Sequence, residues 1–201
     1  MEAVLRQELA QLVRWIHSKG WALATGGNFS AVLQDEPLRL LITPSGIEKG
    51  ETTPECLLIV NDQGEKLQGD GKPSAETLLH TAILAELSPK VIVHTHSIWN
   101  NLASMKNDRF YTLEGYEMLK ALNGVMTHEH TEKIPILENS QDMVQLNAEV
   151  RARLQETPDC HAFLLKQHGL YTWGKSIIEA RRHLEVLEWL FELNERKERM
   201  N

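Results

Sequence analysis

The stretch KVIVHTHS at residues 90–97 decides how the rest of the sequence is interpreted. Residues 91–93 are all β-branched, and an uninterrupted apolar run of this kind is typical of a buried strand. A helix is predicted before the stretch over residues 75–87, where Pro89 stops it, and a second helix is predicted after it over residues 98–105. A buried strand between two helices predicts an α/β domain built in layers.

Strands and helices alternate in both directions from this stretch. A periodic apolar face predicts an N-terminal helix that ends at Gly20, and a capping box over residues 176–179 opens a final helix. The elements expected in between are strands at residues 30–33, 38–42, 56–60, 133–137, 161–166 and 169–173 and helices at residues 114–122 and 141–155. Several strands are joined by short hairpin-like links, so we expect a mixed sheet. No repeat or linker divides the chain, which predicts a single domain over residues 1–201.

The composition is that of a folded protein with an acidic surface. The chain has 21 Lys and Arg against 28 Asp and Glu, a net charge of −7, and 42% of its residues are hydrophobic. These values disfavour a disordered chain and a sequence-independent nucleic-acid binder, which needs a basic surface. No apolar run approaches the ~20 residues that cross a bilayer, and the N-terminus has no signal-peptide core, so we expect no membrane partner and a cytoplasmic location. Cys56 and Cys160 are too few for a disulfide scaffold and are expected to be reduced, buried thiols.

Two histidines end the buried strand at positions that share one face. Residues two apart in a strand point to the same side, so His94 and His96 project together, about 6–7 Å apart along the strand. Two imidazoles in that arrangement can converge on a divalent cation, and a catalytic zinc-type site needs a third protein ligand. We choose His168 for that role, because it ends an apolar strand and the following Gly169 permits a close approach.

Other histidines provide alternatives to a metal site. A lone His-x-His pair is more often a structural or surface pair, and the chain contains a second one, His128 and His130, in a segment typical of a solvated loop. His80 lies one helical turn after Glu76, so the two side chains could share a helix face. The same spacing is common on ordinary helix surfaces, and the sequence alone does not separate the two interpretations. Surface or packing roles are expected for His17, His161 and His183.

Five motifs occur in the order seen in a known family. They are GGNFS at 26–30, TPSG at 43–46, HTHS at 94–97, YEMLK at 116–120 and QHG at 167–169. Together they resemble the class II aldolase/adducin family, and the resemblance covers nearly the whole chain. It implies a three-layer α/β/α sandwich with a central mixed, largely antiparallel sheet. It also implies one zinc ion per subunit and a homotetramer of C4 symmetry with its sites near the subunit interfaces.

The resemblance assigns roles to individual residues. It makes His94, His96 and His168 the zinc ligands. It makes Glu117 the catalytic acid/base. It places a substrate phosphate among Gly27, Asn28, Ser45, Gly46 and Ser74. Glycine turns and helix N-termini present free N–H groups to anions, and Ser74 is the expected N-cap of the helix over residues 75–87, which gives this last assignment a physical basis. Without the resemblance, residues 25–30 would be an ordinary turn.

A second carboxylate complicates the assignment of the base. The segment PSAE at residues 73–76 resembles the one that, in the sugar-phosphate aldolases of the family, supplies a carboxylate next to the metal. Glu76 could therefore be a fourth ligand, a second base or a remnant, and we rank it below Glu117.

The implied reaction is the dehydration of a phosphorylated ketose. Residues 116–120 and Trp173-Gly174 point to the dehydratases of the family, which implies a ketose 1-phosphate substrate with a methylthio tail and a 2,3-diketone phosphate product in methionine salvage. Zinc would polarise the C2 carbonyl while a base removes the C3 proton and a general acid protonates the leaving C4 hydroxyl. One carboxyl group could serve both proton steps if burial raised its pKa. The neighbours of Glu117 favour such burial, although a solvated helix glutamate is the commoner role for this residue type.

Two other functions remain open from the residues alone. A class II sugar-phosphate aldolase or a pentulose-phosphate 4-epimerase uses the same metal chemistry on different bonds, and these relatives often use a tyrosine from the C-terminal tail. No tyrosine follows Tyr171 in this chain, although Tyr111 or Tyr116 could substitute. A non-catalytic, adducin-like binding module would need no metal ligands, so the three histidines and Glu117 argue against it.

Overall fold

A single nine-stranded sheet forms the centre of the computed structural model, which describes residues 2–198 and 200. Its strands are β1 (Asn28–Gln34), β2 (Arg39–Ile42), β3 (Leu58–Val60), β4 (Lys66–Gln68), β5 (Val91–Thr95), β6 (Phe110–Glu114), β7 (Thr131–Leu137), β8 (Ala162–Leu165) and β9 (Gly169–Gly174). They lie in the order β4-β3-β2-β1-β5-β9-β8-β7-β6. β7 and β8 pair in parallel, whereas the other neighbouring pairs are antiparallel. The predicted mixed, largely antiparallel sheet is therefore confirmed.

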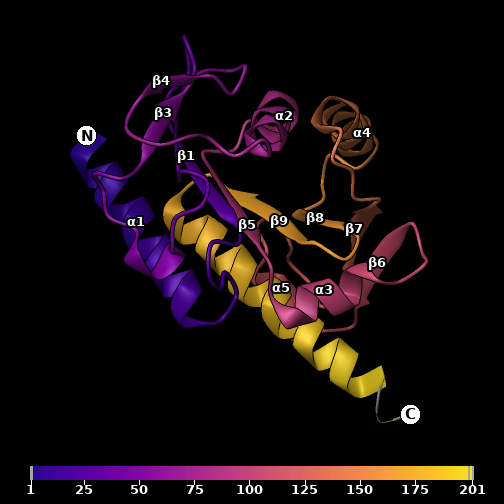
Figure 1. The fold of residues 1–201 in the computed structure, drawn as a ribbon. Helices are drawn as coiled ribbons and strands as arrows, with labels where there is room; N and C mark the ends of the chain where they lie inside the picture. The colour runs from indigo at the N-terminus through magenta and orange to yellow at the C-terminus, as the bar shows by residue number, and fades with distance from the viewer. Residues whose placement is uncertain (1, 199, 201) are drawn as a thin grey trace.

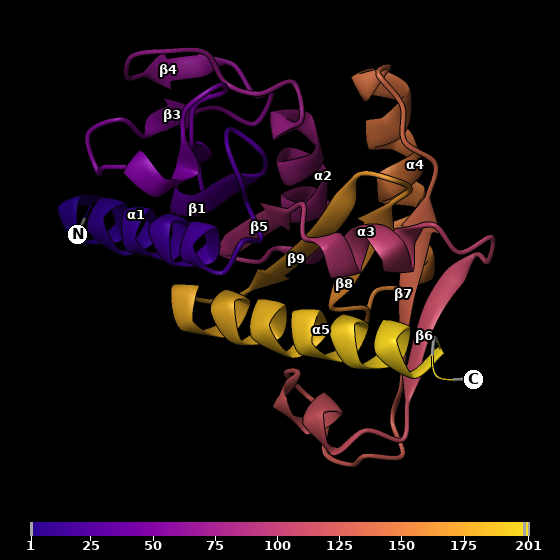
Figure 2. The ribbon, with the colours of Figure 1, turned by 60° about the horizontal axis from the view of Figure 1, so that its bottom comes forward.

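Helices cover both faces of this sheet (Figures 1 and 2). They are α1 (Glu2–Ser18), α2 (Thr77–Leu87), α3 (Ile98–Ser104), α4 (Met143–Glu156) and α5 (Ile177–Glu198), with short 3₁₀ helices η1 (Lys49–Glu51) and η2 (Glu117–Ala121). α2 and α4 pack side by side on one face, while α1, α3 and α5 lie on the other (Figure 1). The predicted three-layer α/β/α sandwich is confirmed. None of the helices within the described residues has the length and apolarity needed to cross a bilayer.

The alternation along β5 assigns its side chains to two separate cores. Val91 and Val93 pack in the core beneath α1 and α5, and Ile92 packs in the core beneath α2 and α4. Because the period of a strand is two, His94 continues the side of Ile92 and Thr95 the side of Val93. β5 lies between β1 and β9 at the centre of the sheet, where rigid neighbours hold both of these side chains.

The structure corrects the segment predicted as a helix over residues 114–122. Its first residue ends strand β6, which the sequence did not reveal, and the helical part is only the five-residue 3₁₀ helix η2. Gly115 separates them with a φ of +75°, a left-handed conformation that interrupts a helix. β6 exists because it pairs with β7, a tertiary contact that local sequence does not encode.

Two smaller expectations are also corrected. Ser74 is not the N-cap of α2, because that helix begins at Thr77 after the N-cap residue Glu76. Ser74 instead belongs to the preceding turn, where its hydroxyl accepts the N–H of Glu76 at 3.3 Å. Of the two cysteines, Cys160 is buried as expected, whereas Cys56 is only half-buried, and both are free thiols.

Candidate metal centre

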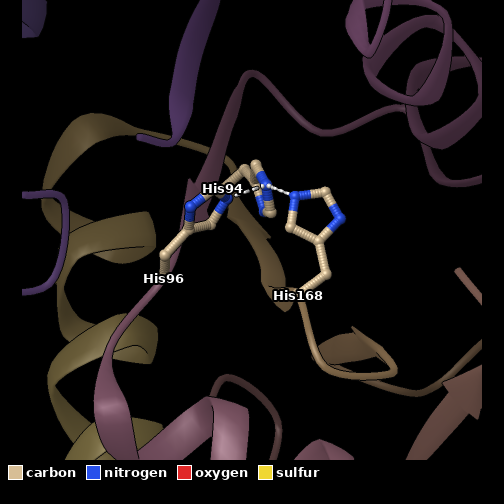
Figure 3. Close-up of side chains that lie close together, drawn as sticks. All are labelled: His94, His96 and His168. Atoms are coloured by element: carbon tan, nitrogen blue, oxygen red, sulfur yellow. Dashed lines mark hydrogen bonds between the residues drawn. The ribbon is translucent and has the colours of Figure 1, made fainter. Parts of the chain in front are cut away.

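Three histidine rings meet at the carboxyl end of β5 (Figure 3). Nε2 of His94 lies 2.8 Å from Nε2 of His96 and 3.3 Å from Nε2 of His168. One ligand atom from each ring lies within 4.8 Å of the other two. The two histidines of the His-x-His pair and the one chosen from a distant turn are thus brought together, although 74 positions separate His94 from His168.

Backbone contacts position His96 and His168 so that their rings face His94. His96 follows β5, and its N–H donates to the carbonyl of Trp21 at 2.8 Å. His168 lies in the turn between β8 and β9, directly after Gln167, whose φ of +54° turns the chain sharply. Nδ2 of Asn101 donates to the carbonyl of His168 at 2.9 Å and so ties this turn to α3.

Two glycines allow the backbone to approach the histidines closely. A Cβ on Gly169 would lie 2.2 Å from the carbonyl oxygen of Thr95 and 2.9 Å from Cδ2 of His96. A Cβ on Gly26 would lie 2.9 Å from Nδ1 of His96. The close approach expected at Gly169 is therefore present, and the glycine turn at residues 25–27 packs directly against the site.

Burial holds the rings of His94 and His96 in the neutral form. Nδ1 of His94 donates to the carbonyl of Leu170 at 3.0 Å, which leaves Nε2 as the acceptor that faces the other rings. Burial lowers the pKa of His94 well below its usual value, and the neighbouring imidazoles lower it further. Burial also lowers the pKa of His96 to about 4, with further contributions from His168 and Lys49. Neutral imidazole is the form that binds a metal ion.

The donor set fits a divalent transition-metal ion. Four-coordinate zinc with bonds of about 2.0–2.1 Å to nitrogen places its ligand atoms about 3.3 Å apart. Nε2 of His94 lies at this distance, 3.3 Å, from Nε2 of His168. Its distance from Nε2 of His96 is 2.8 Å, which is 0.5 Å shorter. Three nitrogen ligands suit zinc and also accept other divalent ions. The geometry therefore supports a metal centre of this class without selecting one ion.

A carboxylate stands beside two of the three rings. Oε1 of Glu76 lies 3.1 Å from Nε2 of His168, and Oε2 lies 3.8 Å from Nε2 of His94. Nδ2 of Asn28 donates to Oε2 at 2.6 Å and holds the carboxylate in place. Glu76, ranked second from the sequence, is the predicted carboxylate that the structure places at the histidines.

A buried carboxylate on α5, that of Glu188, binds the residues at the carboxyl end of β5 from the other face of the sheet. Glu188 accepts hydrogen bonds from Oγ of Ser97 at 2.6 Å, Nδ2 of Asn100 at 2.9 Å and Oγ1 of Thr95 at 3.4 Å. Burial raises its pKa to about 7. The sequence carried a signal for this residue, since Glu188 lies four positions after Leu184 within the apolar stripe of the last helix.

The loops predicted to hold a phosphate lie together next to the histidines. Asn28 opens β1 directly opposite His94 on β5. The turn after β2 joins the loop before α2, because the N–H of Ser45 donates to the carbonyl of Lys72 at 2.8 Å. The remaining members of the predicted set lie in these same loops, namely Gly27, Gly46 and Ser74. Gly27 and Gly46 both have a φ of +78°, so these turns depend on glycine.

A buried lysine lies beneath the glycine turn, and sequence reasoning missed it. Lys49 is 1% exposed, and its Nζ donates to the carbonyl oxygens of Thr25 at 2.7 Å and Ile47 at 3.1 Å. Burial lowers its pKa. The polar run Glu48-Lys49-Gly50 is typical of a solvated surface, so no local signal distinguished this residue.

Glu117 lies apart from the histidines. It belongs to η2, its side chain is 73% exposed, and its carboxylate contacts Lys120 at 2.7 Å and His128 at 3.8 Å. The hydrogen bond from Lys120 lowers its pKa, with the charge of Lys120 acting in the same direction. The burial and raised pKa expected for Glu117 are therefore wrong, because Tyr116 and Leu119 pack against the core while the Glu117 side chain faces outward.

The second His-x-His pair does not join the site. His128 is exposed, and Nε2 of His130 bonds to Glu132 at 2.8 Å. His161 contacts the same buried carboxylate through Nδ1 at 3.1 Å. His130, Glu132 and His161 thus form a structural network at the opposite end of β9. The exposure of His128 agrees with the predicted solvated loop, and the contacts of His161 agree with a packing role.

Comparison with known proteins agrees with this geometry. The family pattern described as Class II Aldolase and Adducin N-terminal domain matches residues 7–194. A methylthioribulose-1-phosphate dehydratase of Methylococcus capsulatus is 43% identical over 190 residues, which cover 94% of this chain and 92% of the relative. A protein of the same name from Serratia proteamaculans is 43% identical over 92% of this chain and 90% of its own length.

Solved structures show the same fold. YgbL from Klebsiella pneumoniae is 30% identical with a TM-score of 0.81, over 96% of this chain and 89% of that one. L-Fuculose-1-phosphate aldolase from Thermus thermophilus has a TM-score of 0.75 at 24% identity, over 96% of this chain and 94% of that one, a likeness that concerns the fold alone. Since the family pattern and the relatives both span almost the entire chain, the protein belongs to the class II aldolase and adducin family.

Proposed function

We propose that the protein is a zinc-dependent dehydratase that converts 5-methylthioribulose 1-phosphate to 2,3-diketo-5-methylthiopentyl 1-phosphate in methionine salvage. The observation that carries this proposal is the cluster of three imidazoles with a carboxylate beside it. It occurs in a chain whose relatives over nine-tenths of its length are named for this activity. His94, His96 and His168 would hold the ion, which supplies Lewis-acid polarisation of the substrate carbonyl.

The chain itself supplies the groups that move protons. The reaction needs a base at C3, which is α to the carbonyl, and an acid at the C4 hydroxyl that leaves as water. Glu76 and Glu117 are the two carboxyl groups proposed for these steps. Glu76 is supported by its contacts with His94 and His168. Glu117 is supported by the resemblance of residues 116–120 to the family motif.

We place Glu117 in the site of a neighbouring subunit of a homotetramer. Within one subunit its carboxylate points outward, so it can serve a site only across an interface. Exposed apolar side chains on the same segment support such an interface, because Met118 is 37% and Met126 is 85% exposed. The site would then combine three histidines and Glu76 of one subunit with Glu117 of the next.

The phosphate of the substrate is assigned to the loops beside Asn28. Gly27 and Gly46 provide turns in which backbone N–H groups can face an anion, and Ser45 and Ser74 add hydroxyl donors. The ammonium of Lys49 lies directly beneath the first of these turns and favours a negative charge there.

Turnover of three phosphorylated ketoses tests the proposal. The zinc-loaded protein should dehydrate methylthioribulose 1-phosphate faster than it cleaves fuculose 1-phosphate or epimerises ribulose 5-phosphate. A sugar-phosphate aldolase is the second candidate. Residues 73–76 resemble the segment that supplies a carboxylate next to the metal in those aldolases, and Glu76 lies beside the histidines. Preferential cleavage of fuculose 1-phosphate would replace the dehydratase by an aldolase. A purified protein without stoichiometric metal and without turnover would instead indicate a binding module.

A further inference from the structure

A continuous line of hydrogen bonds runs from the site into the protein behind it. Nδ2 of Asn28 donates to Oε2 of Glu76 at 2.6 Å. Nε2 of His80 is bonded to Oδ1 of the same amide, and Oγ of Ser30 lies 2.7 Å from Nδ1 of His80. Ser30 and His80 are fully buried and Asn28 is 4% exposed. Water therefore cannot replace these bonds, and the loss of one leaves a buried polar group unpaired.

The chemistry of the four groups fixes the direction of each bond. Nδ2 of Asn28 donates to Glu76, so the amide turns its carbonyl oxygen, which only accepts, towards His80. Nε2 of His80 therefore carries the proton, and Nδ1 accepts from the hydroxyl of Ser30. Burial lowers the pKa of His80 to about 3, which agrees with a neutral ring that has a single N–H.

The backbone leaves the Asn28 side chain as the movable part of this chain of bonds. Asn28 opens β1 and pairs with His94 across the strands, so its main chain is fixed. Glu76 is the N-cap residue of α2, and His80 lies one turn further along that helix. The amide of Asn28 thus joins two residues of one helix turn to β1, which pairs with the strand that carries His94.

We propose that His80 is a positioning residue, which fixes the orientation of the Glu76 carboxylate through the amide of Asn28. This inference rests on the role given to Glu76 under the proposed function. With no donor at Nε2 of His80, the amide can rotate and turn its carbonyl towards Glu76. Two acceptors would then face each other, and the carboxylate would move away from its place beside His168.

Two substitutions separate positioning from packing. In His80→Gln the amide nitrogen can take the place of Nε2 and still donate to Asn28. His80→Asn is one methylene shorter, so its amide reaches the place of Nδ1 and loses the bond to Asn28. A control is His161→Gln, which alters a half-buried histidine bonded to a carboxylate, Glu132, outside the site.

The expected result is a difference in kcat between variants that all remain folded at the assay temperature, as thermal denaturation of each variant checks. His80→Asn should lower kcat about 10- to 100-fold, as loss of the partners around metal-site residues typically does. His80→Gln and His161→Gln should stay within about twofold of the wild type, the scatter of independent substitutions. In a Glu76→Gln background, His80→Asn should cost less than about a further twofold, because the group that it positions is already altered. Equal losses in His80→Gln and His80→Asn, or full additivity with Glu76→Gln, would overturn the proposal.

A second measurement does not depend on turnover or on folding of a variant. Long-range ¹H–¹⁵N correlation spectra of the zinc-loaded wild type should show His80 as the neutral Nε2–H tautomer. A Nδ1–H tautomer or a cationic ring would contradict the assigned bond to Asn28. If instead Glu76→Gln alone leaves kcat unchanged, the role of Glu76 fails and this proposal fails with it. If His80 is the Nε2–H tautomer but Glu76→Gln leaves kcat unchanged, the assigned hydrogen bonds are correct and the role given to Glu76 under the proposed function is wrong.

Discussion

The carboxylate of Glu76 lies 3.1 Å from Nε2 of His168, although Glu76 precedes α2 and His168 lies in the turn between β8 and β9. The contact arises because α2 packs on the face of the sheet towards which His94 points. A carboxylate so close to a metal-site imidazole is placed for proton transfer or for ligation. The structure thus gives a physical basis for a role of Glu76 in proton transfer or ligation, which it does not give for Glu117 within one subunit.

Replacing Glu76 by glutamine should lower kcat about 100-fold or more, the contribution typical of general acid/base catalysis. The amide keeps the shape of the side chain and can still bond to Asn28, so folding should be unaffected. Steady-state kinetics with methylthioribulose 1-phosphate and zinc analysis of the same sample provide the measurement. A loss of less than about tenfold, with full metal content, would remove Glu76 from the list of proton-transfer groups.

His168→Gln should abolish stoichiometric zinc binding and activity together. This ligand is the suitable one to test, because its side chain is 19% exposed and its loss opens no deep cavity, whereas His94 is fully buried and stacked on Tyr171. Zinc per subunit is measured by elemental analysis after dialysis. His128→Gln, in the second His-x-His pair, is the control and should keep its zinc. Equal zinc in both variants would contradict the assigned ligand.

The sequence predicted the parts of the site that depend on local periodicity. The alternation in residues 91–96 placed His94 and His96 together, and Gly169 marked the close approach of a second strand end. These features need only the period of a strand and the small volume of glycine. They also locate the candidate site at the end of β5, where the three histidines meet in the structure.

What the sequence missed depends on packing between distant segments. Glu76 and His80 each contact Asn28, about 50 positions away. Local sequence does not encode these contacts, so they could not be used when Glu76 was ranked below Glu117. The burial of Lys49 likewise depends on the glycine turn that lies over it. Glu188 could have been found, because a charged residue within an apolar helix stripe requires buried partners.

Subunits that lack different parts of the site should complement each other if Glu117 acts across an interface. Mixed tetramers of Glu117→Gln and His168→Gln subunits contain sites with both native groups, at about a quarter of all sites for random equal mixing in a heterologous ring. Co-expression should therefore restore about a quarter of the wild-type activity. Mixtures of Glu76→Gln with His168→Gln serve as the control and should stay inactive, because these two residues meet within one subunit. No gain in the first mixture would rule out Glu117 as a group supplied by a neighbour.

Glu188 should make the free energy of unfolding fall as the pH rises from about 4.5 to about 7. Burial raises its pKa from 4.5 in the unfolded chain to about 7 in the fold, so over this interval the folded state keeps a proton that the unfolded state has released. The stabilisation is complete below pH 4.5 and is lost as the pH passes the folded pKa. At about 1.4 kcal/mol per pKa unit the change amounts to roughly 3 kcal/mol. Glu188→Gln keeps partners for Ser97 and Asn100 but cannot titrate, so the wild type should lose this amount relative to the variant. Chemical denaturation of both zinc-loaded proteins at several pH values measures the difference, and a constant difference across the interval would show that Glu188 keeps the same charge in both states.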